Sequence, residues 1–167
     1  MRILGVDPGS LRTGWGLLIG TAGRPRLLEC GVIQLGPNSS LPTRLHSLRV
    51  EFEALVQRLH PTSAAVEAPF HGPNARSAFH LTHARGVLLA VLGGEGIPVA
   101  EYTPATVKKA VTGNGRAEKG QVQGMVGRLL GSGSQPFDAA DALGVAFCHA
   151  SSLGYRSAVG RAPERRH

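Results

Sequence analysis

The stretch RILGVDPGSLRTGWGLL, residues 2–18, decides the fold, because two apolar strand-like segments flank a short polar turn. The first segment ends on Asp7, and Asp-Pro-Gly-Ser suits a type II turn with a positive φ at Gly9. Residues 3–6 are apolar or glycine on both faces, which is typical of a buried strand. Burying an ionised carboxylate there costs several kcal/mol unless a partner compensates it. We therefore expect partners for Asp7.

The first 36 residues predict three antiparallel strands. Three apolar runs, RILGVD (2–7), GWGLLIG (14–20) and LLECGVIQLG (27–36), are separated by segments rich in turn-forming residues. Between residues 42 and 60, apolar residues recur at spacings of three and four, which predicts a helix that ends at Pro61.

The remainder of the chain alternates between strands and helices. SAAVEAP (63–69) and IPVAEYTP (97–104) read as strands, and helices are expected over 75–92, 104–111 and 118–130 and from about Asp138. This order predicts an α/β protein with a mixed five-stranded sheet, three strands antiparallel and then two parallel, flanked by helices. We expect one folded domain over residues 1–155 and a basic, disordered tail over 156–167.

The charge balance favours a polyanionic partner. Eighteen Lys and Arg against eleven Asp and Glu give a net charge of +7, and nucleic acid is the leading candidate, although a solvated basic surface with an Arg-rich tail is an alternative. The two cysteines, Cys30 and Cys148, have no metal-binding spacing and suit a reducing compartment. With no signal peptide and no apolar run near ~20 residues, we expect a cytoplasmic protein without membrane contact.

Four carboxylates form a candidate metal site. Asp7 and Glu67 each end an apolar strand, and Asp138 and Asp141 are spaced to share one face of a helix. Helix capping alone explains the second pair equally well. Oxygen ligands favour Mg²⁺ or Mn²⁺, and two such ions would support hydrolysis of a phosphodiester bond. The expected cofactor is thus Mg²⁺, two ions per site, which Mn²⁺ can replace.

Five motifs in order give the chain a resemblance to a known family. They are GVDPGSLRTGWG, the stretch from Glu67 to Gly86, Tyr102-Thr-Pro with Val107-Lys108, GNGRAEKGQVQGMV and DAADAL. From Met1 to about Ser152 the sequence resembles the RuvC family of bacterial Holliday-junction resolvases, which have an RNase H-like fold. The resemblance implies that Asp7, Glu67, Asp138 and Asp141 are the catalytic, metal-binding acids.

The resemblance also implies contacts with DNA. Phe70 matches an aromatic residue that stacks on an unpaired base, which is worth roughly 1–3 kcal/mol per base. Lys108 and Lys119 match lysines that hold phosphate near the active site, and Lys119 is expected to be catalytic. Further candidates for phosphate or base contacts are Asn74, Arg76, Ser77, Arg85 and Arg116. Two departures stand out: Pro69 precedes Phe70, and Gly144 replaces an expected alanine.

The implied activity is resolution of four-way DNA junctions by paired, symmetric nicks that leave 5′-phosphate and 3′-hydroxyl ends. A homodimer is expected, because two symmetric cuts require two active sites related by a two-fold axis; the helix over 75–92 is its candidate interface, although that helix fits a buried core position too. A branch-migration motor is a partner by resemblance alone. The alternatives are an actin-like ATPase, a junction-binding module without catalysis, and a related nuclease that acts on RNA.

Overall fold

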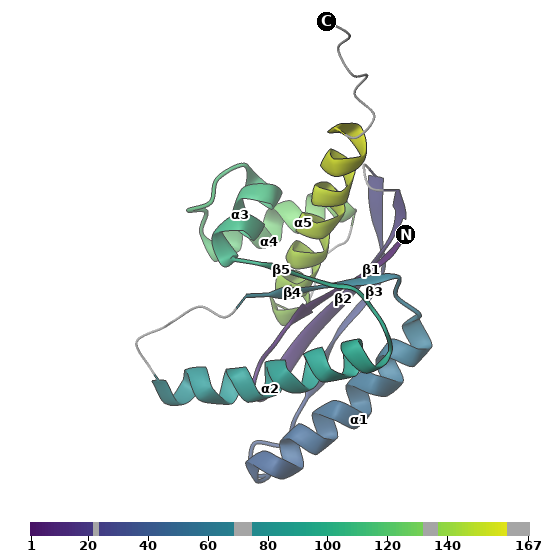
Figure 1. Ribbon diagram of the computed structural model, residues 1–167. Helices are drawn as coiled ribbons and strands as arrows, with labels where there is room; N and C mark the ends of the chain where they lie inside the picture. Colours follow the sequence, from purple (N-terminus) through teal and green to yellow (C-terminus); the bar gives the residue numbers. More distant parts are fainter. Residues whose placement is uncertain (22–23, 69–74, 132–136, 160–167) are drawn as a thin grey trace, which may run out of the picture.

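The computed structural model describes residues 1–21, 24–68, 75–131 and 137–159, with side chains described except at 75–78, 137 and 156–159. Five strands form one sheet (Figure 1), and they are β1 (Arg2–Asp7), β2 (Arg12–Thr21), β3 (Arg24–Gln34), β4 (Ser63–Glu67) and β5 (Val99–Tyr102). Their order is β3-β2-β1-β4-β5. The pairs β1–β2 and β2–β3 are antiparallel, whereas β1–β4 and β4–β5 are parallel. The predicted sheet is confirmed.

Helices cover both faces of this sheet (Figure 1). On one face lie α1 (Leu41–Leu59) and α2 (Ala75–Gly94), and on the other lie α3 (Pro104–Thr112), α4 (Lys119–Leu130) and α5 (Phe137–Val159). Thr103 caps α3 by accepting a hydrogen bond from the amide of Thr106, and Pro104 occupies its first turn. Helix α5 continues past Tyr155, where composition had placed the end of the folded domain.

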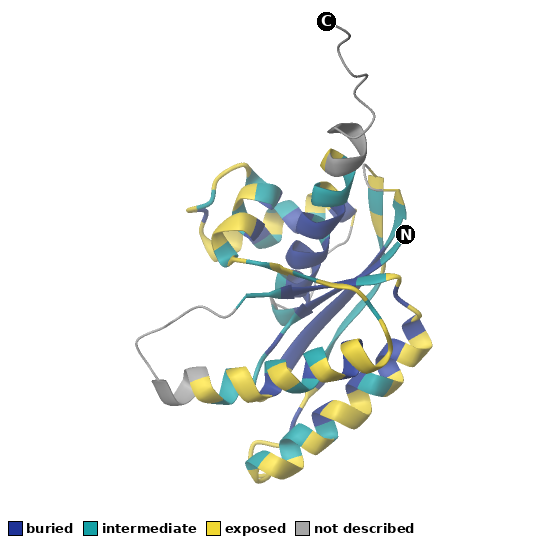
Figure 2. Ribbon diagram, viewed as in Figure 1, coloured by how far each residue is buried: buried dark blue, intermediate teal, exposed yellow. Residues whose placement is uncertain are grey.

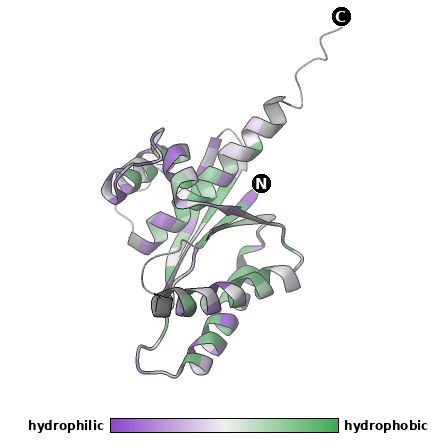
Figure 3. Ribbon diagram, turned by 60° about the vertical axis from the view of Figure 1, so that its left-hand side comes forward, coloured by the Kyte–Doolittle hydropathy of each residue, from purple (hydrophilic) through white to green (hydrophobic). Residues whose placement is uncertain are grey.

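Alternation along β1 divides the interior into two cores. Leu4 and Val6 face α1 and α2, while Ile3 faces the core formed with α5. Buried residues follow the central strands and the helix sides that meet them (Figure 2), and hydrophobic residues follow the strands and the adjoining part of α5 (Figure 3). None of the helices described here is both long and apolar enough to cross a bilayer.

Glycines let α5 lie directly on β1 and β2. A Cβ atom on Gly5 would collide with the carbonyl oxygen of Ala142, and one on Gly14 would collide with the carbonyl oxygen of Asp138. Gly16, the register partner of Gly5, leaves the space that the side chain of Leu143 fills. The first two turns of α5 are therefore seated on the sheet beside the end of β1.

The turn after β1 differs from the sequence prediction. Gly9 is not among the glycines with a positive φ, so the type II turn predicted at residues 7–10 is wrong. Instead, a Cβ atom on Gly9 would collide with the carbonyl of Arg12. The buried Thr13 hydroxyl donates a hydrogen bond to the carbonyl of Gly9 at 3.2 Å. Close packing of the turn, rather than a left-handed backbone, accounts for this glycine.

Candidate active site

Asp7 and Glu67 meet at the carboxyl ends of two neighbouring parallel strands, β1 and β4. Burial and the charge of Glu67 raise the pKa of Asp7 to about 8, and burial raises the pKa of Glu67 as well. The two side chains are hydrogen-bonded to each other. Without a cation, burial and the closeness of the two acids therefore favour a proton held by this pair over two ionised carboxylates.

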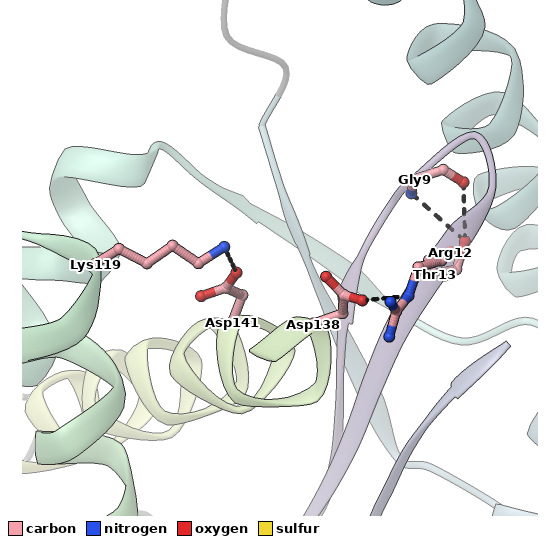
Figure 4. A network of polar contacts seen from close by, with 6 residues as sticks. All are labelled: Gly9, Arg12, Thr13, Lys119, Asp138 and Asp141. Atoms are coloured by element: carbon pink, nitrogen blue, oxygen red, sulfur yellow. Dashed lines mark hydrogen bonds and ion pairs between the residues drawn. The ribbon is translucent and has the colours of Figure 1, made fainter. Parts of the chain in front are cut away.

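Asp138 and Asp141 lie on the first two turns of α5, where the helix dipole favours negative charge. Asp138 pairs with the Nε atom of Arg12 at 2.8 Å, and Asp141 pairs with the ammonium group of Lys119 at 2.6 Å. Figure 4 shows these two cations approaching the two acids from opposite sides. Each acid of α5 thus has a cationic partner from a different element, β2 or α4.

Electrostatic coupling joins the two pairs of acids. The charge of Asp141 contributes to the raised pKa values of both Asp7 and Glu67. Hydrogen bonding to Asp141 raises the pKa of Lys119, with smaller contributions from the charges of Asp7 and Asp138. All four predicted acids therefore interact electrostatically with Lys119.

Two cavities open beside Glu67. One, of about 240 Å³, is lined by Glu67, Asp141, Lys108 and Lys119 among other residues. The other, of about 110 Å³, is lined by Asp7, Glu67 and Arg85, with Leu81 and Pro104 in its wall. Asp7, Glu67 and Asp141 thus line cavities that also present cationic side chains, an arrangement suited to a phosphate backbone.

Arg85 is the most enclosed cation of this site. Its side chain is only 13% exposed, and its Nη2 atom pairs with the carboxylate of Glu101. Its Nε atom is buried and has no hydrogen-bond partner among the described residues. With Nη2 held by Glu101, Nε is the donor of Arg85 that remains for an acceptor in the cavity that it shares with Asp7.

The donor set fits a hard divalent cation. Four carboxylates and no sulfur or imidazole ligand suit Mg²⁺ or Mn²⁺, and the raised pKa values of Asp7 and Glu67 mean that a nearby positive charge would stabilise their ionised forms. Within the described ranges, no three Asp, Glu, His or Cys side chains are arranged to hold a metal ion as they stand. The acids are gathered, but those of α5 are turned to Arg12 and Lys119.

The other predicted contacts have mixed placements. Lys108, half-buried, lines the larger of these two cavities, and exposed Arg116 follows α3, where its amide donates to the side chain of Asn114. Phe70 and Asn74 lie outside the described residues. Arg76 and Ser77 belong to α2, but their side chains lie outside the description.

Sequence reasoning missed two contributors to the site. Arg12 was read only as part of a motif, although it supplies the partner of Asp138. Gly14 was read as a strand residue, although its missing side chain admits the start of α5. The available signal was the alternation of glycine at positions 14 and 16 in an otherwise apolar strand.

Together, the mixed sheet, the last helix across it and the carboxylates at their junction define the class: an α/β protein of RNase H-like fold with a cluster of acids where α5 meets the sheet. Residues 3–149 match the family described as crossover junction endodeoxyribonuclease RuvC, and the chain belongs to this RuvC family.

Similar proteins include the RuvC of Magnetococcus marinus, 46% identical over 150 residues that cover 89% of this chain and 83% of the relative. The RuvC of Syntrophomonas wolfei is 44% identical over 154 residues, covering 91% and 90%. Among solved structures, Thermus thermophilus RuvC in complex with a Holliday junction substrate superposes with a TM-score of 0.87 at 31% identity, covering 94% of this chain and 97% of that one.

Proposed function

We propose that the chain is a structure-selective endonuclease that resolves four-way DNA junctions by paired, symmetric, metal-dependent hydrolysis. The products are 5′-phosphate and 3′-hydroxyl ends, as required in recombination and repair. The observation that carries the proposal is the Asp7–Glu67 pair at the ends of β1 and β4, with Glu67 lining the same cavity as Asp141 of α5. Membership of the RuvC family supports it, as does the similarity to a relative solved with a Holliday junction.

Asp7, Glu67, Asp138 and Asp141 are the residues that would hold Mg²⁺, with two ions expected per site. When bound, such ions supply the positive charge that lowers the pKa of a water and stabilises the departing oxygen. The Asp7–Glu67 pair suits a cation. A positive charge between the two acids would offset both the repulsion between them and the cost of burying their ionised forms.

The cationic side chains at the two cavities would position the backbone of the DNA. Lys108 and Lys119 line the cavity that contains Glu67 and Asp141, so a phosphate there would meet both ammonium groups. Lys119 is paired with Asp141 and keeps its proton, since that contact raises its pKa. We assign Lys119 to the catalytic centre and Lys108 to phosphate binding.

Contacts farther from the acids are proposed from the family motif. Phe70 would stack on an unpaired base at the junction, and Asn74, Arg76 and Ser77 would contact the backbone or bases near it. Arg116, exposed between α3 and α4, would contact a phosphate.

A homodimer is proposed because two like strands must be cut symmetrically. Phe79 of α2 supports an interface there, since its side chain is 66% exposed although it is large and apolar. The rest of the described outer side of α2 is small or polar, with Thr82, Gly86 and Ala90 exposed. Gel filtration at micromolar concentration tests the dimer: the expected species is a dimer that Phe79→Ser weakens, and a wild-type monomer would contradict it.

By relationship with RuvC proteins we also propose a branch-migration motor as a partner. We propose the cytoplasm as the compartment, because the relatives are bacterial and bacterial chromosomes lie in the cytoplasm.

The experiment that tests the function uses one four-way junction in which the two strands of like polarity carry different labels, and it measures the cleavage of each. Wild-type protein with Mg²⁺ should nick the two strands at symmetric positions, and ligase should seal the products because the ends are 5′-phosphate and 3′-hydroxyl. Asp7→Asn should bind the junction without nicking it. Nicks on one strand only, or wild-type nicking by Asp7→Asn, would contradict the proposal.

A further inference from the structure

Arg12 has a fixed backbone and a long, accessible side chain. Its backbone follows the turn held by Thr13 and Gly9 and pairs in register with Gln34 of β3. The neighbouring carbonyl of Leu11 accepts a hydrogen bond from the amide of Leu35 at 2.8 Å. The side chain of Arg12, however, is 57% exposed as it extends to Asp138. The position of the guanidinium is thus set by its partner, not by packing.

This contact opposes the role proposed for Asp138. A carboxylate that is to hold a cation is already paired with one, at 2.8 Å. In Figure 4 Arg12 and Asp138 lie at the end of the network away from Lys119. An ion pair this exposed to water contributes little to stability. Arg12 can therefore exchange partners at small cost.

We infer that Arg12 is a shared cation of the active site: it neutralises Asp138 in the free protein, and it contacts a phosphate of the DNA when either DNA or metal binds and replaces one partner of the pair. The inference rests on the proposed function and deepens it. A guanidinium suits both partners, because its fork of donors matches carboxylate and phosphate oxygens equally. Metal that binds Asp138 then releases Arg12 for DNA, and DNA that binds Arg12 releases Asp138 for metal.

Two effects of opposite sign follow for Arg12→Gln. The free protein should bind Mn²⁺ about two- to fivefold more tightly, because no cation competes for Asp138. The metal-free protein should bind junction DNA more weakly, and the slope of log affinity against log salt should decrease by about one. Replacing a residue that only supports the fold would not strengthen the binding of one ligand while it weakens the binding of the other.

The test measures Mn²⁺ binding by calorimetry without DNA, and junction binding in EDTA over a range of salt concentrations. Arg12→Lys keeps the charge and should resemble wild type in both measurements, whereas Arg12→Glu should enlarge both effects. Arg49→Gln is the matched control, since Arg49 is a similarly exposed arginine paired with Glu53 on α1, on the opposite face of the sheet. It should change neither affinity.

An Arg12→Gln variant with unchanged or weaker Mn²⁺ affinity would overturn the inference, and so would an unchanged salt slope. Both outcomes leave the proposed function standing as long as wild-type protein binds Mn²⁺ and the junction. If wild-type protein bound neither, the proposed function itself would fail, and the two failures are thereby distinguished.

Discussion

The carbonyl oxygen of Asp138 occupies the space that a side chain at Gly14 would need. Gly14 is also the register partner of Asp7 in the β1–β2 pair. One glycine therefore links the two halves of the site, because it lies beside the acid of β1 and beneath the first turn of α5. The distance between the two sets of carboxylates depends on this absence of a methyl group.

Gly14→Ala should displace the start of α5 and impair cleavage. Overpacking of this kind costs about 1–3 kcal/mol of stability, and the backbone of Asp138 cannot move aside as a flexible side chain could. Thermal unfolding and junction nicking measure the two effects. Unchanged nicking in a stable Gly14→Ala protein would show that the close approach is not needed.

Gly144→Ala is the matched control on the same helix. A Cβ atom there would have its nearest neighbour, a methyl group of Val107, at 3.4 Å, which is ordinary contact. Replacing glycine by alanine inside a helix favours folding by up to about 1 kcal/mol. We expect equal or higher stability and unchanged nicking; a loss of stability comparable to that of Gly14→Ala would contradict the packing described for α5.

The elements that the sequence predicted correctly are those with local signals. Alternation around residues 2–7 and 14–20 and the three-and-four spacing over 42–60 depend on neighbours along the chain. Asp7 was recognised because a charge ends an apolar strand, and Glu67 for the same reason. These features required no knowledge of which helix covers which face.

What escaped prediction depends on contacts between distant segments. The Arg12–Asp138 pair joins residues 126 positions apart, and nothing near Arg12 in the sequence indicates that partner. The burial of Arg85 likewise depends on where α2 crosses the edge of the sheet near Glu101. At Gly9, chain-local turn statistics suggested a positive φ, whereas the constraint is the nearby carbonyl of Arg12.

Asp7→Asn should stabilise the metal-free protein at alkaline pH. Burial first, and then the charges of Glu67 and Asp141, raise the pKa of Asp7 to about 8, so the folded protein binds this proton more tightly than the unfolded chain does. The stabilisation from protonation is complete below the ordinary Asp pKa of ~3.9 and is lost as the pH rises to about 8. Asn keeps the shape without the charge.

The measurement is thermal unfolding in EDTA at pH 5 and pH 8. The advantage of Asp7→Asn over wild type should be larger at pH 8, and adding Mg²⁺ should stabilise wild type more than the variant. An advantage that does not change with pH would contradict the shared proton between Asp7 and Glu67.

Arg85→Met should slow nicking more than it weakens binding. Arg85 lines the cavity that contains Asp7 and Glu67, and its buried Nε donor has no hydrogen-bond partner among the described residues, whereas Nη2 is paired with Glu101. Removing a donor that meets a reacting phosphate should cost about tenfold or more in the rate at saturating junction. Glu101→Gln tests the alternative that Arg85 only joins α2 to β5, because it removes the same ion pair. Equal losses in both variants would favour that alternative.

Lys119→Met should abolish nicking and leave the protein folded, whereas Lys108→Met should reduce it less. Lys119 contacts Asp141 directly at 2.6 Å and its pKa is raised by that contact, so it stays charged across the working pH range. Lys108 shares the cavity, and its charge lowers the pKa of Glu67 only as the smallest of several effects. Single-turnover nicking rates check this order, and a larger loss for Lys108→Met would reverse the assignment.

The most direct measurement compares nicking of a mobile four-way junction, the same sequence as linear duplex, and an RNA–DNA hybrid, each with and without Mg²⁺. The account predicts symmetric nicks on the junction alone and only with the metal. Equal cutting of duplex or hybrid, or cutting of the junction in EDTA, would contradict a metal-dependent resolvase built on Asp7, Glu67, Asp138 and Asp141.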